Sequence, residues 1–203
     1  MAKNDNMEGG QMIAYFAIVV IAISLFVIGM RFTGYSVADT AVLNVTVDKV
    51  AAINFTTDFI NFGNGSVNLG VASATLQSNI PNAVGGSWTY SAQHFTLENI
   101  GNVNVSLDLK TLNDAASFLG GTGPSYQYNV TNLETGSCGT PGITLGSWND
   151  VNTTLDGTRI CGAFNSASGS DTLQIDVKLV IPSDSNSGTA AFTDSFIATG
   201  TSA

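Results

Sequence analysis

Basic and metal-ligating side chains are scarce in this sequence. Of its 203 residues only six are Lys or Arg and one is His, against fifteen Asp or Glu, which leaves a formal net charge of −9. A chain this anionic is repelled by phosphate backbones, so nucleic-acid binding is excluded. The two cysteines, Cys138 and Cys161, have none of the paired spacings of structural zinc sites, which excludes most metalloenzymes and predicts no cofactor.

Charge of either sign is low. Charged residues make up 10% of the chain, against about 25% in a typical globular domain. Asn, Ser and Thr together number 61, and Gly adds 22. The length is that of about one domain. We therefore expect one folded domain with a neutral, polar surface.

One long apolar segment lies near the N-terminus. Met12 to Met30 carries no charge and is bounded by Glu8 and Arg31. At about 1.5 Å per helical residue it covers nearly the whole ~30 Å hydrocarbon layer of a bilayer, and it is apolar on all sides, unlike a helix packed on a core. We divide the chain into a leader at 1–11, a hydrophobic transmembrane or assembly helix at 12–31, and an extracellular domain at 32–203.

Three fates of this helix stay open: a retained anchor in membrane lipid, a cleaved secretory signal, or an assembly helix that packs against other copies of the chain. Ser36, Val37 and Ala38 offer small residues to a signal peptidase, although the apolar run exceeds the roughly 7–15 residues of a signal core. Flanking charge does not set the orientation, because Lys3 in the leader is offset by acidic residues.

Two features indicate that the domain lies outside the cell. Cys138 and Cys161 are 23 positions apart without His partners, which is typical of a disulfide in an oxidising compartment; two free buried cysteines are the alternative. Six Asn-x-Ser/Thr triplets are possible N-glycosylation sites, which makes glycans possible partners. These sites are Asn44, Asn54, Asn64, Asn104, Asn129 and Asn152.

Period-two alternation recurs beyond the apolar segment and predicts an all-β fold. In residues 103–110, Val and Leu alternate with Asn, Ser, Asp and Lys, so one face is buried and the other, with Asn104, meets solvent. Residues 95–98 and the turn residues 99–102 complete a predicted hairpin, and residues 173–181 with 189–199 predict a second. The predicted fold class is an immunoglobulin-like two-sheet β-sandwich preceded by one N-terminal hydrophobic α-helix, with a closed barrel as the alternative.

Further strands are expected where apolar and polar residues alternate between turn residues, giving seven to ten strands in all. These segments are Val42–Val47, Ala52–Phe55, Val67–Val71, Tyr126–Val130 and Ile143–Trp148.

Candidate catalytic and ligand-binding residues are few. His94 falls on the polar face of a predicted strand with no nucleophile motif, and we interpret it as a surface or rim residue. The oxygen-rich segment 149–157 fails the EF-hand pattern, because Leu155 stands at the sixth position counted from Asp150 and Cys161 at the twelfth; a turn with Asx hydrogen bonds is the better interpretation. Five aromatic residues could stack on sugars or pack in the core: Trp88, Tyr90, Tyr126, Tyr128 and Trp148.

Most of the chain resembles archaeal envelope proteins. The segment 95–107, with Phe-Thr-Leu-Glu-Asn-Ile-Gly-Asn-Val-Asn-Val-Ser-Leu, and the later segments 179–184 and 188–199 resemble β-sandwich surface domains of such proteins. Residues 52–63 are similar to the opening strands of membrane-anchored archaeal proteins. This resemblance implies a fold and a location at the cell surface, and no activity.

The N-terminus resembles archaeal type IV pilins and archaellins. Gly9, Gly10 and Gln11 are followed at once by the apolar run. In that family a prepilin peptidase cuts after a Gly, the freed helix packs into a filament core, and a β-sandwich head faces solvent. The resemblance implies cleavage between Gly10 and Gln11 and self-association into a homo-oligomer or filament.

The expected function is that of a non-enzymatic, structural cell-surface protein, with a subunit of a pilus-like filament or envelope layer as the sharper hypothesis. A membrane-anchored adhesin or carbohydrate-binding module is the alternative. An enzyme ranks third, because no paired acids or activated nucleophile stand out in the sequence.

Overall fold

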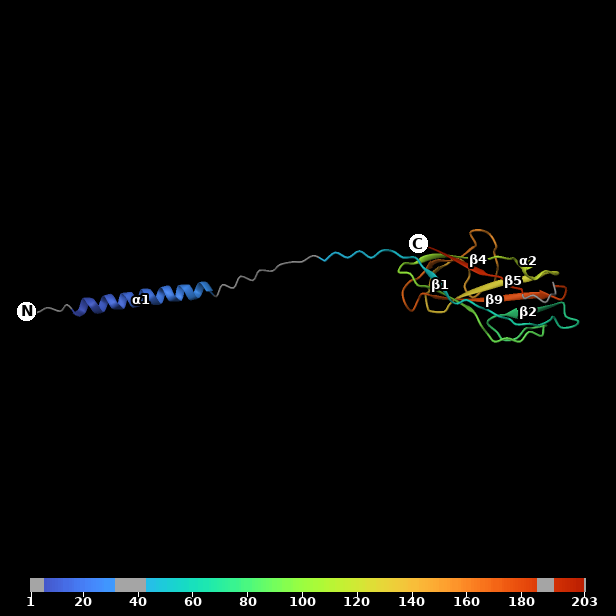
Figure 1. Ribbon diagram of the computed structural model, residues 1–203, viewed down its shortest axis with the longest axis horizontal. Coiled ribbons are helices and arrows are strands. Elements are labelled where there is room, and N and C mark those ends of the chain that lie inside the picture. The colour runs from blue at the N-terminus through green and yellow to red at the C-terminus, as the bar shows by residue number, and fades with distance from the viewer. Residues whose placement is uncertain (1–5, 32–42, 186–191, 203) are drawn as a thin grey trace, which may run out of the picture. The chain divides into compact units, whose positions relative to one another are not determined.

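The computed structural model describes residues 6–31, 43–185 and 192–202 (Figure 1). The chain divides into two units, one ending at Thr46 and the other beginning at Val47. The first unit contains helix α1, Asn6–Arg31, which includes both residues of the expected cleavage point, Gly10 and Gln11. Within the described part of the chain, no helix has the length and apolar character that crossing a membrane requires. Ser36–Ala38 lie outside the described residues.

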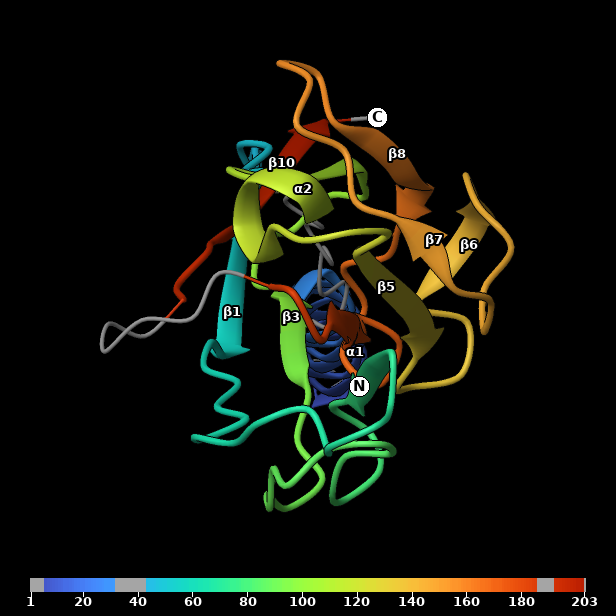
Figure 2. The same ribbon diagram turned by 90° about the vertical axis from the view of Figure 1, so that its right-hand side faces the viewer.

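The second unit consists of strands and one short helix, α2, Ala115–Leu119. The strands form two antiparallel sheets, one in the order β1-β3-β9-β5-β7 with β2 also paired to β9, and one in the order β10-β4-β8-β6 (Figures 1 and 2). The strands are β1 Ile53–Thr57, β2 Ser73–Gln77, β3 Phe95–Asn99, β4 Val105–Thr111, β5 Ser125–Asn132, β6 Cys138–Pro141, β7 Asn149–Asp150, β8 Thr158–Phe164, β9 Thr172–Pro182 and β10 Phe196–Ser202.

The two sheets share one apolar core. In β4 the alternation has its expected result: Val105, Leu107 and Leu109 are buried, and the residues between them are only partly buried. Side chains of β3, β5 and β9 from the first sheet meet those of β4, β6 and β8 from the second in one cluster. The sequence prediction of an all-β unit built from two antiparallel sheets is therefore confirmed.

The long strand β9 organises the first sheet. One side pairs with β5 along eight residues, and the other side pairs with β3 near Leu173 and with β2 near Leu179. Ser78 fills the break between β2 and β3: its N–H donates to the Val177 carbonyl at 2.8 Å, and its hydroxyl accepts from the Val177 N–H at 2.9 Å. One buried serine thus keeps the backbone of β9 hydrogen-bonded where its neighbour changes.

Both predicted hairpins are wrong in their pairing. β3 and β4 lie in different sheets, and so do β9 and β10. Asn99 explains the first case, because this buried side chain donates to the Phe164 carbonyl of the second sheet at 3.1 Å and to the Val103 carbonyl at 3.0 Å. The turn residues therefore carry the chain across the core. Alternation cannot reveal this, because a hairpin and a crossing both turn the same apolar face inward.

The immunoglobulin-like connectivity is not confirmed. From β3 to β10 each successive strand lies in the opposite sheet, whereas an immunoglobulin domain keeps several consecutive strands in one sheet. Among the other predicted strands, Ala52–Phe55 and Tyr126–Val130 overlap β1 and β5, and the total of ten described strands falls in the expected range.

Three other predicted strands are absent from the described residues. Val67 makes a single bridge to Gly86, and 143–148 form turns that lead into β7. Leu43 to Val47 belong to no strand, and Val42 is outside the described residues. These segments carry the alternation but find no continuous partner strand. β2, β6, β7 and β8 were not predicted from the sequence.

The segment that enters β1 is fixed to the turn between β3 and β4. Asn102 Nδ2 donates to the Asp48 carbonyl at 2.8 Å, and its Oδ1 accepts from the Val50 N–H at 2.7 Å. The backbone N–H groups of Gly101 and Asn102 donate to the carbonyls of Ala52 and Val50 at 3.1 and 2.9 Å. A Cβ at Gly101 would collide with the Val50 carbonyl and lie 2.8 Å from the Ala52 nitrogen, so only glycine permits this approach.

We predict that Gly101→Ala lowers the free energy of unfolding by about 1–3 kcal/mol, because overpacking against backbone atoms forces the segment away. Urea unfolding measures this loss, and faster proteolysis near residue 50 would accompany it. Gly139→Ala is the matched control, since the nearest atom to its added Cβ is 3.5 Å away. Equal stability of the two variants would contradict the prediction.

Candidate functional site

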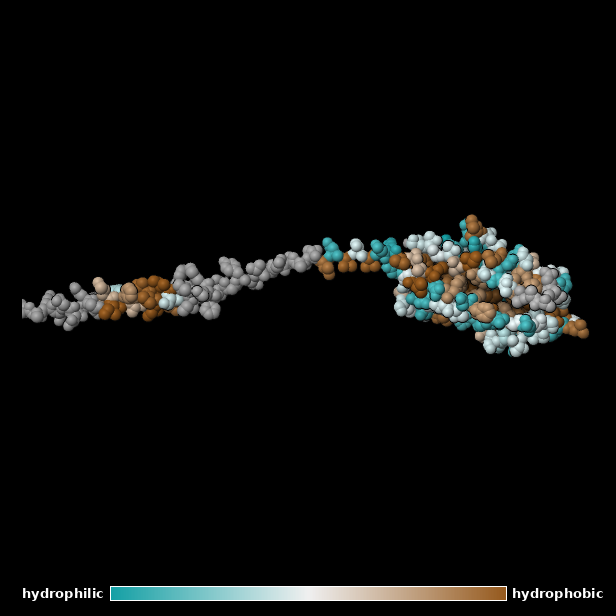
Figure 3. Space-filling view, viewed as in Figure 1, coloured by the Kyte–Doolittle hydropathy of each residue, from teal (hydrophilic) through white to brown (hydrophobic). Residues whose placement is uncertain are grey.

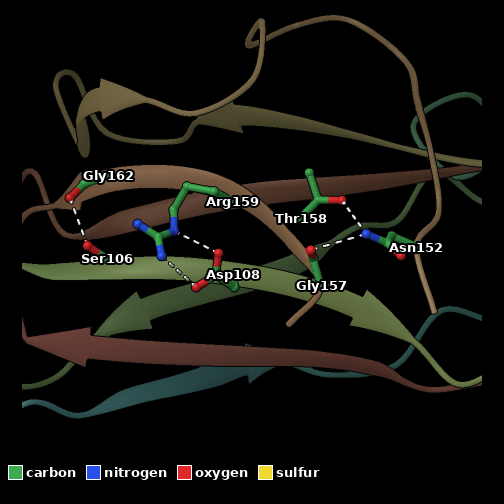
Figure 4. A network of polar contacts seen from close by, with 7 residues as sticks. All are labelled: Ser106, Asp108, Asn152, Gly157, Thr158, Arg159 and Gly162. Carbon is green, nitrogen blue, oxygen red and sulfur yellow. Dashed lines mark hydrogen bonds and ion pairs between the residues drawn. The ribbon is translucent and has the colours of Figure 1, made fainter. Parts of the chain in front are cut away.

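The outer face of the second sheet carries a polar network (Figure 4). Asp108 of β4 and Arg159 of β8 are cross-strand partners, and the guanidinium donates to both carboxylate oxygens, from Nε at 2.7 Å and from Nη2 at 3.0 Å. Asp108 raises the pKa of Arg159 through these bonds and through its charge. Because half of the Arg159 side chain meets solvent, the pair contributes little to stability. The ion pair orients β4 and β8 relative to one another, and both of its charged groups are engaged with each other.

The oxygen-rich segment near this network forms the Asx turn that the sequence predicts. Asn152 Oδ1 accepts from the Thr154 N–H at 2.9 Å. Asn152 Nδ2 donates to the Gly157 carbonyl at 3.1 Å and to Thr158 Oγ1 at 3.2 Å (Figure 4). In the first sheet, Asp150 Oδ1 of β7 accepts from Gln127 Nε2 of β5 at 2.9 Å. Two of the oxygens that resemble a calcium loop, Asn152 Oδ1 and Asp150 Oδ1, therefore accept hydrogen bonds within the protein.

A shallow hollow of about 460 Å³ lies beside the network. Its lining includes Asp108, Asp156, Arg159 and Thr199, and Lys110 Nζ nearby donates to the Leu155 carbonyl at 3.1 Å. Across the described ranges, no three His, Cys, Asp or Glu side chains come close enough together to hold a metal ion. The hollow has a polar floor with its principal charges already paired.

A second polar group lies on the outer face of the first sheet, and the sequence analysis missed it. Asp176 of β9 and Asn129 of β5 are direct cross-strand partners and are 2% and 7% exposed. Gln174 Nε2 donates to Asp176 Oδ1 at 2.8 Å, whereas Asn129 Oδ1 is buried without a hydrogen-bond partner. Alternation assigns both residues to a solvated face. Only the strand register shows that they bury one another.

Burial raises the pKa of Asp176, and the hydrogen bond from Gln174 and the charge of His94 oppose this shift. His94 is half-buried just before β3, which agrees with its interpretation as a rim residue. Its interaction is with a buried carboxyl group of the sheet. Lys178 lies two residues further along the same face of β9, where its ammonium stacks over the ring of Trp148 at 4.9 Å.

Most of the candidate sugar-binding aromatics are used in packing. Trp88 covers Gly65 and Gly86, where any Cβ would collide with its ring. Tyr90 accepts a hydrogen bond from the Gln77 N–H and donates one to the Asn82 carbonyl. Tyr126 and Tyr128 are buried in the two core clusters. Sugar stacking therefore depends on Trp148 alone, whose ring is occupied by Lys178.

The six possible glycosylation sites fall into two groups. Asn129 is buried, and the amide nitrogen of half-buried Asn152 makes two hydrogen bonds in its turn. The remaining four are exposed, which agrees with the solvent face predicted for Asn104: Asn44, Asn54, Asn64 and Asn104. In the folded protein a glycosyl donor reaches these four exposed sites more easily than Asn129 and Asn152.

The predicted disulfide is present. Cys138 of β6 and Cys161 of β8 are joined, with their Cα atoms 5.8 Å apart, and both are buried. The bond crosses neighbouring strands of the second sheet where their register shifts twice. It secures the pairing of a short, irregular edge strand.

Helix α1 presents an apolar surface of its own. Its described side chains, from Met12 to Leu25, are all exposed, and ten of them are large and apolar. Figure 3 shows these residues as an apolar band along the helix. The one hydroxyl among the residues 16–25, Ser24, is satisfied within the helix by the Val20 carbonyl at 2.7 Å. No polar face is left for water.

Comparison with known proteins identifies no relative: no family model, no curated protein and no solved structure matches the chain.

We predict that reduction of the Cys138–Cys161 bond lowers the free energy of unfolding by about 3 kcal/mol, as loop-closure entropy gives for a loop of this length. Urea unfolding with and without a phosphine reductant measures the change. A Cys138→Ala/Cys161→Ala variant is the control, since its unfolding midpoint should not respond to the reductant. An unchanged midpoint in the fully reduced native chain would refute the prediction.

We predict that Asp176→Asn stabilises the protein at neutral pH and that this gain shrinks on acidification. With a raised pKa the folded state holds its proton more tightly, so the carboxyl favours folding below its unfolded pKa of about 3.9 and loses this contribution as the pH rises through the folded pKa. Urea unfolding of the variant and the native chain measures the difference between their free energies of unfolding, once at about pH 7 and once at about pH 3.5.

Asp184→Asn is the control of opposite sign. Thr122 donates to the Asp184 carboxylate from its hydroxyl at 2.6 Å and from its N–H at 2.9 Å, and these bonds lower the pKa of Asp184. This contribution is present above the unfolded pKa and is lost as the pH falls. Asp184→Asn should therefore be less stable than the native chain at neutral pH only. A pH-independent effect of Asp176→Asn would rule out our account of that group.

Proposed function

We propose that this chain is a non-enzymatic structural subunit of an extracellular, pilus-like filament, in which copies of α1 pack together and the β unit faces solvent. The apolar surface of α1 carries the proposal. Complete burial of each large apolar side chain is worth about 1.5–3 kcal/mol, so ten exposed ones make an isolated helix in water strongly unfavourable. Other copies of the same helix, or lipid before assembly, would cover them.

The β unit supports a structural role. Asp108 and Arg159 are paired with each other, and most of its candidate sugar-binding aromatic residues fill the core or cover glycines. A buried disulfide is typical of proteins that fold in an oxidising compartment. We therefore propose a location at the cell surface, with glycans on the four exposed sites.

The resemblance of the N-terminus to archaeal pilins is the second support. A leader that ends at Gly10 would leave Gln11 as the first residue of the assembling helix. In this proposal cleavage releases the helix from its leader, and the mature chain enters the filament. The mass of the native N-terminal peptide distinguishes a start at Gln11 from an uncleaved chain.

We predict that Val19→Lys abolishes filament assembly, because a charge in the middle of α1 would have to be buried between packed helices. The test is electron microscopy of the purified full-length chain after detergent removal. Leu112→Lys is the matched control, since this side chain of the β unit is also exposed, and its filaments should form normally. Native protein that only inserts into lipid vesicles as single copies would defeat the filament proposal in favour of a membrane anchor.

A further inference from the structure

Residues 43–47 have the pattern of a strand but no partner. Leu43, Val45 and Val47 alternate with Asn44 and Thr46, which is the pattern of a strand with one buried face. In the structure the three apolar side chains are 88%, 75% and 78% exposed. No strand among the described residues pairs with them. If the segment is extended, Leu43, Val45 and Val47 form one apolar face that another surface can cover.

The second sheet provides an unprotected edge. β10, Phe196–Ser202, pairs along its whole length with β4, and in the described part of the chain no strand lies on its other side. Edge strands are normally protected by charges, proline, bulges or short length, and β10 has no charged residue, no proline and no register shift. The other edges have such a feature or a partner: β1 has a bulge, β6 has two register shifts, β7 has only two residues, and β2 is bridged at Thr75 to Val84.

The side chains along β10 match a strand with one apolar face. Phe196 and Ala198 pack against the core, and Phe196 lies 5.3 Å from the ring of Phe95 and 5.8 Å from that of Tyr126, so the beginning of the strand is held in place. Thr199 and Thr201 line the polar hollow on the outer face. An added strand would turn apolar residues toward Phe196 and Ala198 and polar residues toward the threonines.

The half-buried residues of β1 mark the gap that such a strand would close. Ile53 and Phe55 pack against the core without being covered, and Ile53 lies close to Gly200 of β10, where a Cβ would be 3.3 Å from its Cγ2. β1 and β10 are therefore neighbouring edges of the two sheets. Apolar side chains added beside β10 would cover this open end of the core.

We propose that residues 43–47 of one copy add as a further strand to β10 of a second copy. This inference rests on the proposed filament function, and it specifies how the β units of neighbouring copies would contact one another. We assign the acceptor to another copy because Asp48, Val50 and Ala52, which directly follow the donor segment, are held by hydrogen bonds to the turn at 99–102 of their own unit and not along β10. Donor and acceptor are different surfaces, so the contact is heterologous and builds an open filament when the rotation between copies does not close a ring.

Photo-crosslinking tests the contact directly. Full-length chains with benzoylphenylalanine at position 45 are assembled as a mixture of ¹⁵N-labelled and unlabelled copies and irradiated. We expect crosslinked peptides that contain residues 196–202 and join a labelled to an unlabelled copy. The same photoreactive residue at Leu69, which is fully exposed in the loop before β2 and does not line the hollow beside β10, is the control and should not label β10. Crosslinks confined to one copy, or directed to other strands, would overturn the proposal.

Substitution gives an independent measurement. Val45→Asn/Val47→Asn should weaken association between copies about tenfold or more, while the unfolding of the β unit stays unchanged because both side chains are already exposed. Leu69→Asn, also at a fully exposed apolar side chain, is the matched control and should leave association unaltered. Filaments that persist undiminished in the double variant would reject strand addition and leave the filament function standing. Crosslinked copies that never extend into filaments would instead reject the filament function.

Discussion

A single apolar layer between the two sheets holds the β unit together. Leu107 and Leu109 of β4 enter this layer from one side, and Leu173 and Ile175 of β9 enter it from the other. Because successive strands alternate between the sheets, nearly every connection must cross an end of this layer. Asn99 and Gly101 show what a crossing requires: a buried amide that donates to a carbonyl of the turn and to one of the second sheet, and a residue without a side chain where backbones meet.

The same layer divides the polar groups into two kinds. On the outer face of the second sheet, Asp108 and Arg159 are partly solvated, so their pairing contributes little to stability and leaves the strand edges free. On the first sheet, Asp176 and Asn129 are buried together, and the raised pKa of Asp176 follows from that burial. The cost of this pair is offset by the pairing of β5 and β9, the longest in the protein.

The proposed assembly would use apolar and hydrogen-bonding groups that the layer does not cover. The exposed apolar side chains of α1, the alternating segment 43–47 and the open edge at β10 all lie outside it. Each is unfavourable in an isolated copy, and each can be relieved by contact with another. The proposed filament uses the helix for its core and the added strand for its head contacts, so two separate interactions would have to form for growth.

The sequence by itself determined the elements with strong local patterns. The faces of β4 and β9, the positions of β1 and β5, the Asx turn at Asn152 and the disulfide between Cys138 and Cys161 could all be predicted, because side-chain period, turn chemistry and cysteine spacing are local properties. The tertiary structure alone decided which strands pair, where the chain changes sheets, and that Asn129 faces Asp176. These depend on contacts between residues far apart in the chain, and an apolar face satisfies the same alternation whichever sheet it belongs to.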